Sequence, residues 1–331
     1  MIKIIFKKGQ GLGNQLWLFA VAKSLSEHLN KELEIDNFEN FKGKNFLKLD
    51  YFNFETKNQK DLQRNNCEKY SIFNEKIYYD SDLKYIISNF DENILKISDY
   101  TILEGIFQSE KYFFGNFNKL KRYISLKKSY INNDKIDSKF CVLNIRGGEY
   151  KRHKDFLLPK SYWENAIENF IKIYDIHKFK IVTDDYKYSK ALFPDLEIIH
   201  SDISKCYSTI YNCKNIIVSN SSFAYFPCKT GIKKNIIAPM FWARPIKNNG
   251  RWISPCNLYK DWLYQDTNNE LFKYKDCLKI AEKTDEYYKN EFTVLIRKKD
   301  IPSKGILNFL PIKFKIFLKK YLSVIFPKHI G

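Results

Sequence analysis

Near its N-terminal end the chain reads IKIIFKKGQGLGN (residues 2–14). Residues 2–6 are apolar apart from Lys3 and rich in β-branched side chains, which is typical of a buried strand, and the glycines that follow break the run. Over residues 16–29 apolar positions recur three and four apart, which predicts a helix. Residues 33–36 predict a second strand, so this part of the chain has the pattern of a βαβ unit.

A more regular alternation of strands and helices fills the second half of the sequence. Such alternation predicts a doubly wound parallel sheet. Before it, residues 101–107 predict a strand that leads into a capped helix start at 108–113, whereas residues 37–100 are weakly patterned and are expected to form short helices and loops. The predicted strands of the second half are residues 140–145, 179–182, 196–199, 216–219 and 235–238, and the predicted helices are residues 160–174, 186–193, 203–212 and 222–230.

The chain is long enough for two domains, because 331 residues exceed the usual size of a single hydrophobic core. A polar stretch, Lys127–Ser138, separates the two patterned regions and has the composition of a linker. We therefore expect an α/β protein of two Rossmann-like domains, residues 1–135 and 136–265, that face a cleft. C-terminal helices and a basic tail follow over residues 266–331.

The formal net charge of +18 is unevenly distributed: residues 297–331 carry nine basic side chains and one acidic, and so contribute +8. No Arg-rich stripe with interleaved aromatic residues occurs elsewhere, which argues against a nucleic acid partner. Over residues 312–326 most lysines fall opposite aromatic and aliphatic side chains at helical spacing, which favours an amphipathic helix lying on an anionic membrane. Two alternatives stay open: the helix docks on the N-terminal domain, or residues 312–316 form a strand.

The seven cysteines are an odd number, lie scattered and form no Cys-x-x-Cys pair. We expect reduced thiols in the core rather than disulfides or zinc ligands. The sequence has neither a signal-peptide core nor a run of about 18 apolar residues. We therefore expect a cytoplasmic protein, held by its tail at the inner face of the cytoplasmic membrane.

The glycine turn with Gly11, Gly13 and Asn14 lies between a predicted strand and helix, where backbone N–H groups and the helix dipole favour a phosphate. The alternative is a tight turn that needs glycine for packing alone. A dinucleotide fingerprint is a second alternative, because Asp36 ends the next strand. The third glycine of that fingerprint is missing, since Leu16 occupies its position, so an NAD enzyme is the weaker interpretation.

Charged side chains follow two of the predicted strands, at the edge where parallel sheets bind ligands. The planar guanidinium of Arg146 suits a pyrophosphate, because it can bind two oxygens at once; the alternative is a structural ion pair with Glu149. Asp184 and Asp185 could bind ribose, a base or a metal, and an Asp pair is equally a common helix N-cap. Asn220, Ser221, Ser222 and Phe223 open a helix with donors that suit phosphate, and the same residue types are preferred caps.

Three segments taken together resemble family-11 glycosyltransferases, the bacterial α-1,2-fucosyltransferases. They are GLGNQL (residues 11–16), Arg146 with its neighbours, and SNSSF (residues 219–223), in matching order and separation. The similarity spans about residues 2–265 and includes the further segments LEGIFQS (103–109), Tyr112-Phe113, VTDD (182–185), IIAP (236–239) and Trp242.

The resemblance implies a GT-B fold, inversion at the anomeric carbon, a GDP-sugar donor and no metal. The implied reaction transfers L-fucose from GDP-fucose in α-1,2 linkage to a hydroxyl of a glycan or lipid-linked glycan in surface polysaccharide synthesis, as in galactoside 2-α-L-fucosyltransferases. We expect Arg146, Asn14 and Glu149 to take part in catalysis. The expected nucleotide-binding residues are Gly11, Gly13, Asn14, Arg146, Asp184, Asp185, Asn220, Ser221, Ser222 and Phe223.

The chain departs from the family at its central motif, His-x-Arg-Arg-x-Asp. Asn144, Arg146, Gly147 and Glu149 occupy the four informative positions, so one arginine is retained. Alternative donors are a GDP-linked heptose or another deoxyhexose, and a different alternative is a non-catalytic homologue that binds a glycan or nucleotide. The acidic candidates for a general base near the motifs are Glu149, Asp155 and Glu104.

Overall fold

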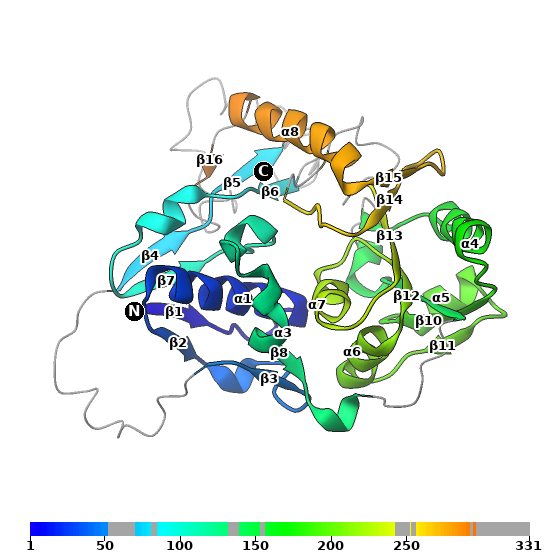
Figure 1. Ribbon diagram of the computed structural model, residues 1–331, viewed down its shortest axis with the longest axis horizontal. Coiled ribbons are helices and arrows are strands. Elements are labelled where there is room, and N and C mark those ends of the chain that lie inside the picture. Colours follow the sequence, from blue (N-terminus) through cyan, green and yellow to red (C-terminus); the bar gives the residue numbers. More distant parts are fainter. Residues whose placement is uncertain are drawn as a thin grey trace, which may run out of the picture.

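The computed structural model describes residues 1–51, 70–80, 85–131, 139–152, 156–241, 252, 256–291 and 294–295. The described chain forms two α/β halves that lie side by side, each built on its own parallel sheet (Figure 1). The α/β class and the GT-B-like arrangement of two parallel sheets, expected from the sequence, are confirmed.

The N-terminal sheet has the strand order β2-β1-β7-β4, with every pair parallel. Helix α1 (Leu12–Leu29) connects its first two strands, as the βαβ pattern predicted. The strands are β1 (Ile2–Ile5), β2 (Leu33–Asp36), β4 (Ser71–Asn74) and β7 (Thr101–Glu104).

The weakly patterned segment 37–100 contains strands that the sequence did not predict. Besides β4 it forms β3 (Leu47–Leu49), which pairs with β8 (Ile124–Leu126), and the hairpin of β5 (Ile77–Asp80) and β6 (Tyr85–Ser88). Strand β16 (Val294–Leu295) adds to that hairpin. The expectation of helices and loops alone was wrong, because these short strands lie in a segment without a regular alternation of strand and helix patterns.

The second sheet has the order β11-β10-β9-β12-β13-β14-β15, parallel except for the antiparallel edge strand β15. Because β15 forms a hairpin with β14, this sheet extends past the boundary expected at residue 265. Its strands are β9 (Phe140–Ile145), β10 (Lys178–Thr183), β11 (Glu197–Ile199), β12 (Asn215–Val218), β13 (Asn235–Pro239), β14 (Leu263–Gln265) and β15 (Leu271–Lys273). Its helices are α4 (Lys160–Tyr174), α5 (Tyr186–Leu192), α6 (Ile203–Asn212) and α7 (Ser222–Thr230).

Further helices lie between and after these elements. Helix α8 (Tyr274–Glu291) follows the second sheet and α3 (Leu120–Tyr123) precedes β8. The 3-10 helices are Phe38–Asn40, Glu92–Lys96, Glu110–Phe113, Asn116–Lys119, Lys128–Tyr130 and Gly148–Arg152. The helix start predicted at residues 108–113 is present, with the side chain of Ser109 accepting a hydrogen bond from the N–H of Lys111.

The two halves share a hydrophobic core where α1 packs against α7. Trp17 of α1 is fully buried and its ring lies 4.2 Å from that of Tyr225 in α7. The hydroxyl of Tyr225 donates to Glu110, which also forms a 3.1 Å ion pair with the largely buried Lys229. Aromatic stacking and a shielded ion pair therefore hold the halves in one arrangement.

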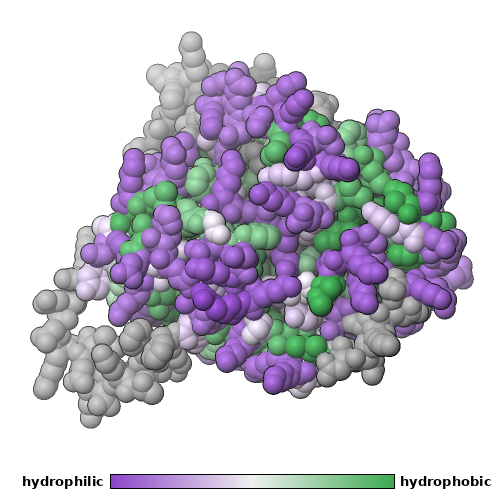
Figure 2. Space-filling view, in the orientation of Figure 1, coloured by the Kyte–Doolittle hydropathy of each residue, from purple (hydrophilic) through white to green (hydrophobic). Residues whose placement is uncertain are grey.

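Hydrophilic side chains cover most of the described surface on the face shown in Figure 2, with hydrophobic residues in smaller patches between them. The six described cysteines are buried and unpaired, as expected for core thiols. Over the described ranges, no helix is both long and apolar enough to span a bilayer. The predicted amphipathic tail, residues 312–326, lies outside the described residues, as do Asp155 and Trp242.

Candidate functional site

A cavity of about 1100 Å³ lies between the two sheets. It is lined by segments that follow the carboxyl ends of β1, β7, β9 and β10, the edge at which parallel α/β sheets bind ligands. From the N-terminal half it is lined by residues 7–14, Lys42, Glu75, 102–106 and Gln108, and from the second half by Arg146, Glu149, Tyr150, 182–184, His200 and 221–223.

Two helix N-termini meet at this cavity. A Cβ added to Gly13, in the first turn of α1, would lie 2.5 Å from the backbone carbonyl carbon of Ser222, the first residue of α7. The glycine therefore permits the contact, so the packing role weighed for the glycine turn applies to Gly13. Since each helix N-terminus carries partial positive charge, the contact also concentrates positive potential in one place.

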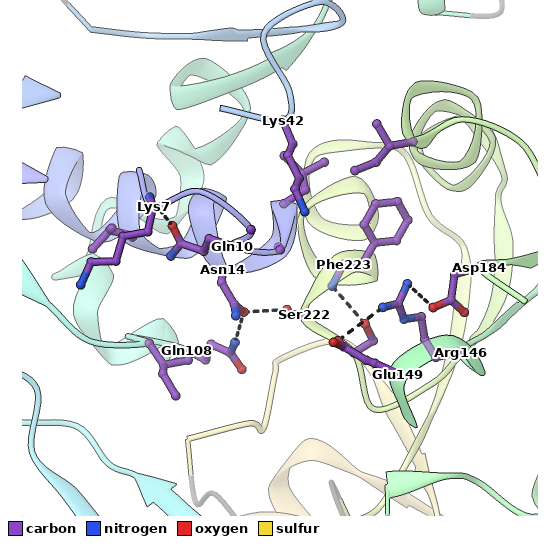
Figure 3. A pocket seen from close by; sticks show the side chains of 18 of the residues that line it. Lys7, Gln10, Asn14, Lys42, Gln108, Arg146, Glu149, Asp184, Ser222 and Phe223 are labelled. Atoms are coloured by element: carbon purple, nitrogen blue, oxygen red, sulfur yellow. Dashed lines mark hydrogen bonds and ion pairs between the residues drawn. The ribbon is translucent and has the colours of Figure 1, made fainter. Parts of the chain in front are cut away.

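Asn14 links the same two helices. Its Oδ1 accepts hydrogen bonds from Nε2 of Gln108 at 2.8 Å and from Oγ of Ser222 at 3.0 Å (Figure 3). Because both donors point at the carbonyl oxygen, the amide orientation is fixed and its N–H₂ group is left to donate elsewhere. Gly11 caps α1 without a side-chain hydrogen bond and lines the cavity, so the first turn of α1 faces open space.

We expect Gly13→Ala to destabilise the fold by about 1–3 kcal/mol, because the new methyl group must push the two helix N-termini apart. Gly11→Ala is the matched control, since an added Cβ there meets no atom within 4 Å. Urea unfolding of both variants checks the prediction. Equal midpoints for the two variants would contradict it.

Arg146 directly follows β9, and its NH1 forms a 2.9 Å ion pair with Oδ2 of Asp184. Glu149, the partner weighed from the sequence, lies 4.0 Å from NH2 and is 72% exposed, so it is the weaker partner. The Nε of Arg146 is buried and has no hydrogen-bond partner among the described residues. The Arg146 side chain is 22% exposed and lines the cavity, so its guanidinium can also donate to an anion there (Figure 3).

The two aspartates after β10 have different roles. Asp184 lines the cavity, and its Oδ1 accepts a hydrogen bond from the N–H of Gly147. Asp185 caps α5 by accepting from the N–H of Tyr188 and pairs with Lys151, away from the cavity lining. Partial burial opposes ionisation of Asp185, but the hydrogen bonds from Lys151 and Tyr188 hold its pKa below the usual value. Asp185 therefore caps a helix outside the cavity lining, and its nucleotide contact stays a prediction.

The residues of the SNSSF segment (219–223) also differ in whether they line the cavity. Ser221 caps α7 by accepting from the N–H of Phe223, and Ser221, Ser222 and Phe223 line the cavity. Asn220 does not line it: its buried side chain donates to the carbonyl of Phe156 at 3.0 Å. Asn220 therefore supports Phe156, which lines the cavity, and its own nucleotide contact stays a prediction.

The cavity residues that the sequence analysis missed include Lys42, Glu75 and Gln108. Lys42 extends its side chain from the N-terminal half toward the cavity (Figure 3), and Gln108 positions Asn14. Glu75 follows β4, a strand without a clear pattern, so no signal marked it. Glu104, a base candidate from the sequence, forms a 3.2 Å ion pair with Lys7.

Over the described residues, no three His, Cys, Asp or Glu side chains form a group that could hold a metal ion.

No protein-family model and no curated protein matches the chain. Among solved structures, it is similar to fucosyltransferase NodZ from Bradyrhizobium, with 14% identity over 68% of this chain and 91% of that chain and a TM-score of 0.37. It is similar to a family-9 glycosyl transferase from Veillonella parvula, with 8% identity over 86% of this chain and 96% of that chain and a TM-score of 0.40. It is also similar to the E. coli heptosyltransferase WaaC with ADP, with 8% identity over 72% of this chain and 87% of that chain and a TM-score of 0.35. Likenesses this distant assign neither a reaction nor a substrate to this chain.

Proposed function

We propose that the protein is an inverting glycosyltransferase that uses a GDP-linked sugar, with L-fucose in α-1,2 linkage to a glycan hydroxyl as the leading candidate. The observation that carries the proposal is the meeting of two helix N-termini and Arg146 at one cavity between two parallel sheets. The resemblance to family-11 glycosyltransferases supports the donor class, because all three segments that carry it contribute to the cavity lining.

The proposed site provides electrostatic stabilisation for a departing diphosphate. In inverting transfer the acceptor hydroxyl attacks the anomeric carbon from the face opposite the diphosphate, and negative charge builds up on the leaving oxygen. The first turns of α1 and α7, the Asn14 amide and the guanidinium of Arg146 surround one side of the cavity with donors. Such preorganised donors stabilise developing charge without reorganising during the reaction.

The nucleoside is proposed to lie toward β10, and the acceptor toward the N-terminal sheet. Asp184, His200 and Ser201 line the cavity on the β10 side and offer hydrogen-bonding groups for a ribose or a base. The acceptor side is lined by the ends of β4 and β7. This division puts leaving group and attacking hydroxyl on opposite walls, as inversion requires.

Calorimetry with GDP, followed by hydrolysis assays with GDP-fucose, GDP-mannose, a GDP-heptose, UDP-sugars and dTDP-sugars, tests the proposal. We expect GDP to bind and one GDP-sugar to be hydrolysed faster than every other donor. Preferred hydrolysis of GDP-heptose would select the alternative donor. GDP binding without turnover of any donor would identify a non-catalytic homologue, and a preference for UDP- or dTDP-sugars would refute the donor class.

A further inference from the structure

A buried carboxyl group lies on the acceptor wall of the cavity. Glu75 follows β4, lines the cavity and is only 3% exposed. It belongs to the N-terminal half, whereas Arg146 and the start of α7 belong to the other half. A carboxylate withdrawn from water in this way is costly unless it is paired, hydrogen-bonded or neutralised by a proton.

The carboxyl group is held in one orientation. Its Oε2 accepts hydrogen bonds from the backbone N–H of Ile106 at 2.6 Å and of Phe107 at 2.8 Å. Gly105 permits this approach, since a Cβ there would lie 2.5 Å from the Cβ of Glu75. A neutral glutamine could accept the same two hydrogen bonds without the cost of burying a charge. Holding residues 106 and 107 in place therefore does not by itself explain why this position is a glutamate.

The surroundings of Glu75 favour proton exchange near neutral pH. Burial raises the pKa of Glu75 to about 7, while the hydrogen bonds from Phe107, Ile106 and Tyr112 lower it and Asp91 raises it. The other titratable group that faces it is the buried thiol of Cys256. A general base works best when its pKa is close to the operating pH.

We propose that Glu75 is the general base of the transfer reaction and takes the proton of the attacking hydroxyl. The inference rests on the proposed function. As the acceptor oxygen forms its bond to the anomeric carbon, the bond from that carbon to the β-phosphate oxygen breaks and GDP leaves with the electron pair. The hydroxyl proton passes to the carboxylate of Glu75, and in the absence of a glycan a water molecule takes the place of the acceptor.

The other acidic candidates fit this role less well. Glu104 is 40% exposed and its carboxylate is paired with Lys7. Glu149 is 72% exposed and lies on the nucleotide side beside Arg146, where the leaving group is proposed to be. Glu75 alone among the three is both buried and on the acceptor wall.

The test compares Glu75→Gln with Glu34→Gln, which makes the same substitution in the same sheet outside the cavity lining. We expect GDP-fucose hydrolysis by Glu75→Gln to fall about a hundredfold or more, with unchanged GDP affinity, while Glu34→Gln keeps the wild-type rate. Because the base must be ionised, wild-type kcat/KM should rise with pH and level off above about 7. Infrared titration should show a carboxylic C=O band, missing in Glu75→Gln, that disappears over the same pH range.

A normal rate and pH profile for Glu75→Gln would overturn the assignment, as would a Glu75 carboxyl already ionised at pH 5. Loss of the pH dependence in Glu149→Gln, with the pH dependence kept in Glu75→Gln, would also overturn the assignment. A wild-type protein that binds no GDP would instead contradict the proposed function. The infrared titration still shows the protonation state of Glu75 in that case, because it does not depend on turnover.

Discussion

Replacing Arg146 with alanine should lower the rate of sugar transfer at least about a hundredfold, because loss of one preorganised donor to a developing oxyanion costs about 2.7–4 kcal/mol. Arg146 is the one arginine kept from the central motif that the chain resembles, so no neighbouring arginine in that motif replaces it. Its removal also leaves Asp184 without its 2.9 Å partner at the cavity wall. Both effects disfavour a diphosphate at this position.

Rates of GDP release from the donor, with Arg152→Ala as the control, check this prediction. Arg152 ends the 3-10 helix that follows Arg146, is exposed and lies outside the cavity lining, so its removal tests loss of charge alone. The account predicts near-normal turnover for Arg152→Ala. Near-normal turnover for Arg146→Ala would contradict the assignment of Arg146 to the leaving group.

Trp17→Ala should destabilise the protein by about 3–5 kcal/mol and also weaken GDP binding. Trp17 is fully buried and stacks on Phe113 at 5.4 Å and on Tyr225 at 4.2 Å, so it joins the N-terminal half to α7. It lies one turn along α1 from Asn14, whose contact with Ser222 depends on the same packing. Loss of the indole therefore loosens the walls of the cavity.

Trp163→Ala is the matched control, because Trp163 is 1% exposed but packs within the core of the second half alone. Urea unfolding combined with GDP calorimetry separates the two effects. Both variants should lose similar stability, and only Trp17→Ala should lose GDP affinity. An unchanged affinity in folded Trp17→Ala would show that the packing between the halves does not shape the nucleotide site.

Strong periodicity in the sequence made much of the second half predictable. The helices at residues 160–174, 203–212 and 222–230 have the predicted bounds. In the first two, amphipathic spacing over ten or more residues gives a clear signal. The polar residues after β9 and β10 could be located for the same reason, since parallel topology brings strand ends together. Strands β3 to β6, each three or four residues long, carried no comparable signal.

The sequence does not reveal which polar side chains line the cavity, because neighbouring residues compete for ligand contacts, helix caps and supporting hydrogen bonds. Asp184 and Asp185 are chemically identical neighbours, yet one lines the cavity and the other caps α5. Asn220 was indistinguishable from the serines beside it, although its buried side chain binds the carbonyl of Phe156. The burial of Glu75 could not be predicted from the sequence, because the N–H groups that bind its carboxylate belong to residues 106 and 107, in a distant segment.

The position of the diphosphate in a crystal structure of the GDP complex tests the central claim most directly. The account predicts phosphate oxygens within hydrogen-bonding distance of Arg146 and of backbone N–H groups in the first turns of α1 and α7, with the nucleoside toward Asp184. GDP bound elsewhere, or in this cavity with its diphosphate away from both helix N-termini and Arg146, would contradict the account.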